Sequence, residues 1–351
     1  MSPSRPLVIW CNYRLRPASV SRLRGAIRPH RPVLDRNQTH TDMAPAVSAR
    51  KLARANIGIG QVTIEDLLAH PNVRSFHIAS ASYTRYDRTE LMQHFSRSGR
   101  SLTNTSQVFA EPCAQHVLAM MLAFARQLLQ SAQTQVIDRA WHYDERREGS
   151  KLLNHQNVVI LGFGAMAKRP VQLLAPFEVH IGALRRCSIK TRGVTALTSR
   201  SLPLALGRAD HVINILPDKP ATRGFASRSL LRRVKKGAIF YNIGRGATVD
   251  QPALLRALQS RRLGGAYLDV VSPEPLPPTH PLWKARNCFI TPHTGGEHLD
   301  EQERLVTHFI SLFPRVSQNG VHKITNCLAR SRVSPHSENL PMTSALFFPV
   351  P

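Results

Sequence analysis

Three side chains in the second half of the chain, Arg245, Glu274 and His293, could together carry out the reduction of a keto acid. That reaction needs a hydride donor at one face of the carbonyl, a proton donor at its oxygen and a cation for the carboxylate. Imidazole titrates near neutral pH, so His293 suits the proton transfer. A nearby Glu274 would orient the ring and raise its pKa, and Arg245 could hold the carboxylate and align the carbonyl carbon.

Each of the three residues also has a structural explanation when it is taken alone. An arginine after a glycine could lie on the surface, the glutamate is in a proline-rich segment, and the histidine is one of 16. The hypothesis of a catalytic set therefore depends on the three occurring together.

A second chemical feature is a glycine-rich turn at residues 162–167, which read GFGAMA. Gly162 would allow a tight turn, Gly164 would let the backbone approach a pyrophosphate, and the small Ala167 would let a helix pack closely on the preceding strand. The pattern predicts a dinucleotide site, with a tight structural turn as the alternative. Pro170 is expected to remove a helix hydrogen bond, to bend the helix and to weaken cofactor binding.

Arg185 and Arg186 stand about 20 residues further on, where a fold that prefers NAD places an acid against the ribose 2′-hydroxyl. A guanidinium pair suits the 2′-phosphate of NADP instead. The alternative is that two arginines mean little in so basic a chain. The absence of the acid makes us favour NADP over NAD.

Short apolar segments alternate with helical patterns from about residue 157 to 291, which indicates a parallel sheet flanked by helices. The expected strands of this region are 158–161, 179–183, 194–197, 211–216, 238–243, 266–270 and 288–290.

The flanking regions predict a smaller α/β unit and two helices. Its expected strands are 7–11, 57–59 and 73–78. Residues 111–130 are expected to form one long helix that is apolar on most faces and therefore lies at a domain or dimer interface. Residues 297–313 are expected to form the final helix, with acids in its N-terminal half.

The motifs together resemble those of the D-isomer-specific 2-hydroxyacid dehydrogenases, in particular the glyoxylate and hydroxypyruvate reductases. The resemblance is carried by the run from Ala238 to Asp250, by LDV at 268–270 with PEPLP at 273–277, and by TPHTGG at 291–296. It continues through 109–112 with His116 and through 217–224, and it covers roughly residues 55 to 315.

This resemblance implies a Rossmann-type doubly wound parallel sheet plus a smaller flavodoxin-like α/β substrate domain. The substrate domain would comprise residues 1–110 and 297–328, and the dinucleotide-binding domain 111–296. Residues 329–351 contain Ser, Pro and Arg without periodicity, and this composition predicts a disordered tail. Arg245, Glu274 and His293 would be catalytic, and Ala81, Ser82 and Arg245 would bind substrate. The implied cofactor contacts are Gly162, Gly164, Ala165, Met166, Arg185, Arg186, Leu216, Pro217, Ile243, Gly244, Asp269 and Gly296.

Two positions depart from the family pattern. Relatives carry a Ser-Ala-Gly-type loop where this chain has Ser80-Ala81-Ser82, so a positive φ at Ser82 would strain the loop. Glu178 occupies a place where relatives carry a small turn residue. For Asp269, a structural capping role is as good an explanation as cofactor contact.

Composition limits the remaining possibilities. A formal net charge of +25 raises the question of nucleic acid, but no block of like charge is present, and we favour arginines spread over solvated faces. Five scattered cysteines indicate neither disulfides nor a metal site and favour a reducing, cytoplasmic location. The longest apolar run is too short for a transmembrane helix. The Arg- and Ser-rich N-terminus is similar in composition to a transit peptide, to which we give little weight.

The leading interpretation is a reductase of glyoxylate, hydroxypyruvate or a related 2-keto acid that uses NADPH or NADH and forms a homodimer. The alternatives are a dinucleotide-binding protein that resembles the corepressors of this family, favoured by the charge and the tail, and a catalytically weakened enzyme.

Overall fold

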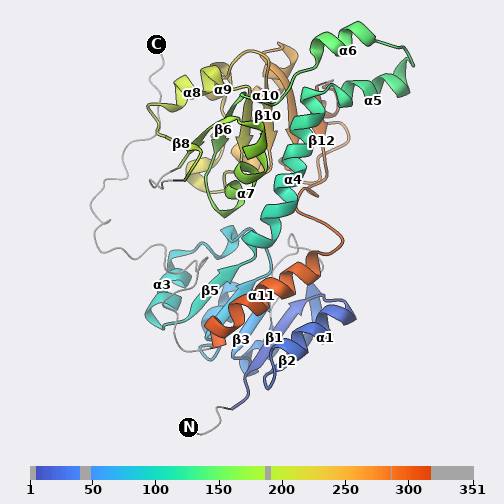
Figure 1. Ribbon diagram of the computed structural model, residues 1–351. Coiled ribbons are helices and arrows are strands. Elements are labelled where there is room, and N and C mark those ends of the chain that lie inside the picture. The colour runs from blue at the N-terminus through green and yellow to red at the C-terminus, as the bar shows by residue number, and fades with distance from the viewer. Residues whose placement is uncertain (1–4, 40–48, 186–190, 286, 318–351) are drawn as a thin grey trace. The chain divides into compact units, whose positions relative to one another are not determined.

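The computed structural model describes residues 5–39, 49–185, 191–285 and 287–317. It divides into two compact units, residues 1–108 with 299–351 and residues 109–298 (Figure 1). The expected tail, 329–351, lies outside the described residues.

The first unit is built on a five-stranded sheet in the order β2-β1-β3-β4-β5, with every pair parallel. This is the flavodoxin-like order, as expected. Its elements are β1 (Val8–Tyr13), α1 (Pro17–Ala26), β2 (Arg31–Thr39), η1 (Arg50–Arg54), β3 (Ile57–Gly60), α2 (Ile64–Ala69), β4 (Ser75–Ile78), η2 (Thr84–Tyr86), α3 (Thr89–Arg97), β5 (Ser101–Asn104) and α11 (Glu301–Ser317).

The second unit holds a seven-stranded parallel sheet in the order β12-β11-β10-β9-β6-β7-β8. The order reverses between β6 and β9, as in a doubly wound dinucleotide fold, so the predicted fold class is confirmed. Its strands are β6 (Asn157–Leu161), β7 (His180–Leu184), β8 (Val194–Leu197), β9 (His211–Asn214), β10 (Ala238–Asn242), β11 (Leu263–Leu268) and β12 (Cys288–Ile290).

Helices cover both faces of this second sheet. Successive strand residues point to opposite faces, and both faces are apolar and must be buried. Val158 faces the core that includes α4, whereas Val159 faces the core on the other side. The helical elements of the unit are α4 (Ser106–Ala125), α5 (Leu128–Ile137), α6 (Tyr143–Gly149), α7 (Ala165–Leu174), η3 (Ala175–Phe177), α8 (Leu202–Arg208), η4 (Pro220–Thr222), α9 (Arg228–Arg233), η5 (Gly246–Thr248), α10 (Gln251–Gln259) and η6 (Pro281–Lys284).

The helix expected at 111–130 is wrong in its bounds. It begins at Ser106 and ends at Ala125, and Gln127 adopts a left-handed conformation, with φ of 56°, before α5 starts. Within the described residues, α4 is the one helix long and apolar enough to cross a membrane, and half of its most apolar window is buried in the protein. Packing of its side chains in the core of the second unit accounts for this apolar character.

Other expectations also need correction. The final helix is four residues later at each end than predicted, because it starts at Glu301 and ends at Ser317. Two strands, β2 and β5, were missed. Pro170 lies inside α7, beyond its first turn as expected, and is buried; the helix continues past it to Leu174.

Candidate active site

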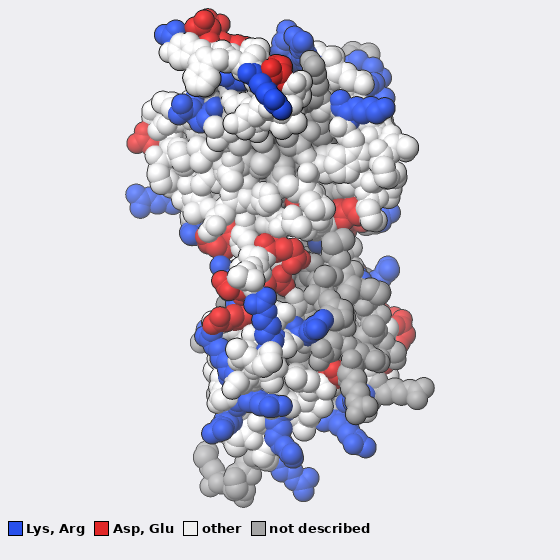
Figure 2. All heavy atoms as spheres, turned by 90° about the vertical axis from the view of Figure 1, so that its right-hand side faces the viewer, with Lys and Arg blue, Asp and Glu red and all other residues white. Residues whose placement is uncertain are grey.

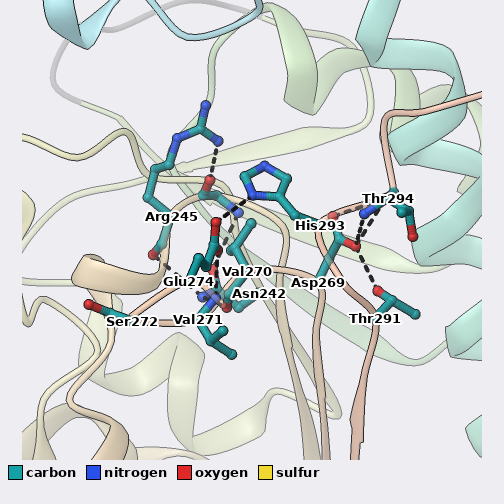
Figure 3. Close-up of polar contacts among 12 residues, drawn as sticks. Asn242, Arg245, Asp269, Val270, Val271, Ser272, Glu274, Thr291, His293 and Thr294 are labelled. Atoms are coloured by element: carbon teal, nitrogen blue, oxygen red, sulfur yellow. Dashed lines mark hydrogen bonds and ion pairs between the residues drawn. The ribbon is translucent and has the colours of Figure 1, made fainter. Parts of the chain in front are cut away.

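The side chains of His293 and Glu274 form a pair at the carboxyl edge of the second sheet. His293 Nδ1 lies 2.8 Å from Glu274 Oε2, and the other carboxylate oxygen accepts a hydrogen bond of 2.9 Å from the Val271 backbone N–H. Figure 3 shows the Nδ1 side of the ring facing Glu274. Both side chains are mostly buried, with exposed fractions of 19% and 24%. Because Nδ1 is engaged, Nε2 is the nitrogen available for proton transfer.

Charge and burial act in opposite directions on this pair. Burial lowers the pKa of His293, but its hydrogen bond to Glu274 and the charge of that carboxylate raise it more, so the net pKa is above the ordinary 6.5. Burial raises the pKa of Glu274, and the bonds from His293 and Val271 outweigh it, so this pKa is lowered. Both shifts favour the charged forms of the pair, an imidazolium beside a carboxylate.

Arg245 follows β10, and Figure 3 shows its side chain on the same side of the site as the His293 ring. Its Nη1 donates to the Gly244 carbonyl at 2.6 Å. Its charge lowers the pKa values of both His293 and Glu274, which is consistent with a guanidinium close to the pair. The structure thus brings together the three residues that the sequence singled out.

A buried polar network, which the sequence reasoning missed, holds the turn after Arg245. Asn242 Nδ2 donates to the carbonyls of Val270 (3.1 Å) and Arg245 (3.4 Å), and Thr248 Oγ1 donates to the Arg245 carbonyl at 2.6 Å. Asn214 Nδ2 donates to Asn242 Oδ1 at 2.9 Å. The sequence contained one indication of this network. Two apolar strands, β9 and β10, both end in asparagine, and the ends of parallel strands lie at the same edge of a sheet.

Asp269 organises the segment that carries His293. Its Oδ1 accepts bonds of 2.9 Å from the backbone N–H groups of Thr294 and Gly295, and a bond of 2.6 Å from the Thr291 hydroxyl. His293 itself adopts φ of 58°, a conformation that a non-glycine residue keeps only when its surroundings impose it. These contacts give Asp269 the capping role that was one of its two expected roles.

The glycine-rich turn has the geometry that a pyrophosphate site requires. Gly162 has φ of 93°, and a Cβ there would lie 3.0 Å from the Ile215 carbonyl oxygen. At Gly164, by contrast, a Cβ would meet no protein atom within 4 Å, so the space beside the start of α7 is open. No side chain caps this helix, whose first residues are Ala165 and Met166. The residues present therefore fit a bound dinucleotide.

The remaining predicted cofactor residues lie on neighbouring strand ends. A Cβ at Gly244 would lie 2.7 Å from the Leu216 carbonyl oxygen, so the backbone of Gly244, which follows Ile243, passes close to that of Leu216, which precedes Pro217. Gly296 packs beside Phe109 of α4.

The ribose position is only partly described. Arg185 directly follows β7 and has no hydrogen-bond or ion-pair partner among the described residues. Arg186 lies outside the described residues. Glu178, by contrast, is among the described residues. It has φ of 53°, which explains why a small turn residue suits that position.

Ala81 and Ser82 belong to the first unit, in the loop after β4. Asn104 Nδ2 donates to the Ala81 carbonyl at 3.0 Å, and the Ser82 N–H donates to Ser80 Oγ at 3.0 Å. Ser82 is not among the described residues with positive φ, so the strain considered for this position is absent.

Comparisons with known proteins identify the family of this chain and agree with its fold. The family model described as D-isomer specific 2-hydroxyacid dehydrogenase, NAD binding domain, matches residues 118–295. A glyoxylate/hydroxypyruvate reductase B of Yersinia pseudotuberculosis is 30% identical over 259 residues, which are 71% of this chain and 76% of that protein. The chain therefore belongs to the D-isomer specific 2-hydroxyacid dehydrogenase family, as its motifs predicted. It is an enzyme of that NAD(P)-dependent class.

Two solved structures share the fold of both units. A D-isomer specific 2-hydroxyacid dehydrogenase from Xanthobacter autotrophicus Py2, solved with NADPH, has a TM-score of 0.75 at 22% identity, over 92% of this chain and 98% of that one. An NADPH-dependent glyoxylate/hydroxypyruvate reductase from Sinorhizobium meliloti has a TM-score of 0.72 at 20% identity, with the same coverage. At these identities the likeness establishes the fold.

Proposed function

We propose that this enzyme reduces a small 2-keto acid, such as glyoxylate or hydroxypyruvate, to the D-2-hydroxy acid. The observation that carries the proposal is the contact of 2.8 Å between His293 Nδ1 and Glu274 Oε2, with Arg245 close by. The names of the reductases from Yersinia pseudotuberculosis and Sinorhizobium meliloti support the choice of substrate.

The roles of the three residues follow from their chemistry. Glu274 keeps the proton on Nδ1 and, through its charge, favours the imidazolium form, so His293 donates the Nε2 proton to the carbonyl oxygen. Arg245 binds the substrate carboxylate with two parallel donors and presents the carbonyl carbon for reduction. The bound nicotinamide supplies the hydride.

We assign the second unit as the dinucleotide-binding domain. Gly162, Gly164, Ala165 and Met166 would hold the pyrophosphate at the start of α7. Leu216, Pro217, Ile243, Gly244, Asp269 and Gly296 would line the rest of the site. Arg185, with Arg186, would bind the 2′-phosphate, which makes NADPH the preferred cofactor.

We assign the first unit as the substrate domain, in which Ala81 and Ser82 would contact the substrate. Among the described residues no group of three His, Cys, Asp or Glu side chains could hold a metal ion, and the proposed reaction uses none. On the face shown in Figure 2, Lys and Arg side chains are spread over both units rather than gathered on one. This face therefore shows no basic patch of described residues confined to one unit (Figure 2).

We also propose a homodimer formed in the cytoplasm. The segment that contains α5 and α6 exposes a set of large apolar side chains, with Val136 83% and Trp141 91% exposed. The set also includes Leu128, Ile137 and Tyr143. A second copy would remove this surface from water. Cys11 and Cys288 form no disulfide with a described residue, which suits a reducing compartment.

The test is the oxidation of NADPH and NADH, followed by nicotinamide absorbance, with glyoxylate and with hydroxypyruvate. We expect turnover with both substrates, faster with NADPH, and D-configured product by chiral analysis. Tight NADPH binding without turnover on any 2-keto acid would overturn the proposed reaction and favour a regulatory, dinucleotide-binding role.

A further inference from the structure

The hydrogen bonds that hold the His293 loop extend one residue further into the protein than Asp269. Tyr267 is fully buried on β11, and its hydroxyl oxygen lies 2.7 Å from Thr291 Oγ1. Thr291 in turn bonds Asp269 Oδ1 at 2.6 Å. Neither Tyr267 nor Thr291 belongs to the set that the sequence singled out.

The direction of this chain of bonds follows from counting protons. An ionised carboxylate only accepts, so Thr291 must donate its single hydroxyl proton to Asp269. Tyr267 must therefore donate to Thr291. Burial and the negative charge of Asp269 raise the pKa of Tyr267 well above its usual value, so the phenol keeps the proton that this arrangement requires.

The ring of Tyr267 is buried and packs against α4. It stacks on His116 of α4, with ring centroids 5.4 Å apart and an angle of 21° between the planes. The end of the same loop packs against α4 as well, since a Cβ at Gly296 would lie 3.0 Å from the Phe109 ring. The packing of the ring against His116 therefore holds the phenol hydroxyl beside Thr291.

We propose that Tyr267 is a positioning residue for the acid–base pair: its hydroxyl orients Thr291, which with Asp269 fixes the loop that holds His293 against Glu274. The inference rests on the proposed function for its effect on turnover. Its effect on the His293 ring does not depend on which substrate the enzyme uses.

A loosened loop has a definite consequence for proton transfer. The charged groups that act on His293 are Glu274, Arg245 and Asp269, and only the carboxylates favour its protonated form. If the loop shifts, the bond of 2.8 Å to Glu274 weakens, while burial and Arg245 continue to favour the neutral ring. The pKa of His293 then falls.

The matched pair for the test is Tyr267→Phe and Tyr241→Phe. Tyr241 pairs with Tyr267 in register on the adjacent strand and is also fully buried, but its hydroxyl contacts His211 Nδ1 at 3.0 Å, in a different network. Each variant removes one buried tyrosine hydroxyl from the same sheet. A role limited to stability would make the two variants alike.

The first readout is the pKa of His293 in the cofactor-free protein, from NMR of labelled histidine with His293→Gln to identify the resonance. We expect Tyr267→Phe to lower it by about 0.5 to 1 unit, where one unit is a tenfold change in the protonation ratio. Tyr241→Phe should leave it in place. An unchanged pKa in Tyr267→Phe, or equal shifts in both variants, would overturn the proposal.

The second readout is steady-state kinetics, where Tyr267→Phe should lower kcat about 3- to 10-fold on the alkaline side, with KM changed less than about twofold. Should Tyr267→Phe not fold, Thr291→Val and Thr291→Ser replace it. The valine should reproduce the lowered pKa and the serine should restore it, and equal values for the two would overturn the proposal. A pKa shift in a protein that turns over no 2-keto acid would uphold the positioning role and refute the proposed function.

Discussion

The two units present the same architectural feature, the carboxyl edge of a parallel sheet, with different chemistry. In the second unit the loops at this edge are held by acidic side chains, since Glu274 binds His293 and Asp269 binds three donors of the 291–295 segment. In the first unit the loop after β4 is held by neutral groups, such as the amide of Asn104 on the Ala81 carbonyl. The difference is that the carboxyl edge of the second unit carries the titratable pair that the proposed acid–base chemistry requires.

The comparison is tested most severely by His293→Ala. Loss of a positioned general acid should lower kcat by about 10²- to 10⁴-fold, with little change in KM. The control is His155→Ala, because His155 also has positive φ and also lies beside a glutamate, Glu178, at 3.6 Å. A His293→Ala enzyme that kept more than a tenth of wild-type kcat would show that the proton comes from elsewhere.

Glu274→Gln should have the next largest effect, and it fixes the sign of the pH dependence. Reduction needs protonated His293, whose raised pKa keeps the wild type active above pH 6.5 until the ring loses its proton. Without the carboxylate, burial and Arg245 lower that pKa, so the alkaline limb of kcat moves to lower pH. We expect about 10- to 100-fold less activity at neutral pH, recovering as the pH falls. A limb that stays in place in the pH profile would refute the pairing.

Arg185→Ala sharpens the comparison within the second unit, because it separates cofactor choice from proton transfer. A charge-assisted hydrogen bond to a 2′-phosphate contributes roughly 1.5 to 3 kcal/mol, so the KM for NADPH should rise by about 10- to 100-fold. The KM for NADH and the pH profile should not change. Equal effects on both cofactors, measured in parallel titrations, would remove the argument for NADPH.

Ser82→Gly should have the smallest effect. Ser82 does not have positive φ, so glycine relieves no strain there. We expect the KM for the keto acid to change by less than about threefold and the alkaline limb to stay in place. A shift of the alkaline limb of the pH profile would mean that the first unit also affects the pKa of His293, which would contradict the difference between the two units.

Periodicity succeeded where elements are apolar and failed where they are polar. The central strands of the second sheet, such as β6 and β10, were expected at nearly their observed positions, because most of their residues are buried and hydrophobic. The strands β2 and β5 were missed, since RPVLDRNQT and SLTN carry mostly polar side chains. The break between α4 and α5 falls at Gln127, a residue type that does not mark a turn.

By itself the sequence determined the family, the order of the strand and helix patterns and the identity of Arg245, Glu274 and His293, since these are properties of residue type and local spacing. Only the tertiary structure decided how those residues are held. The bonds from Tyr267 through Thr291 to Asp269, and from Asn214 to Asn242, join residues that are 22 to 28 positions apart or lie on different strands. Such contacts exist only once parallel strands bring their ends together, so they leave no local pattern in the chain.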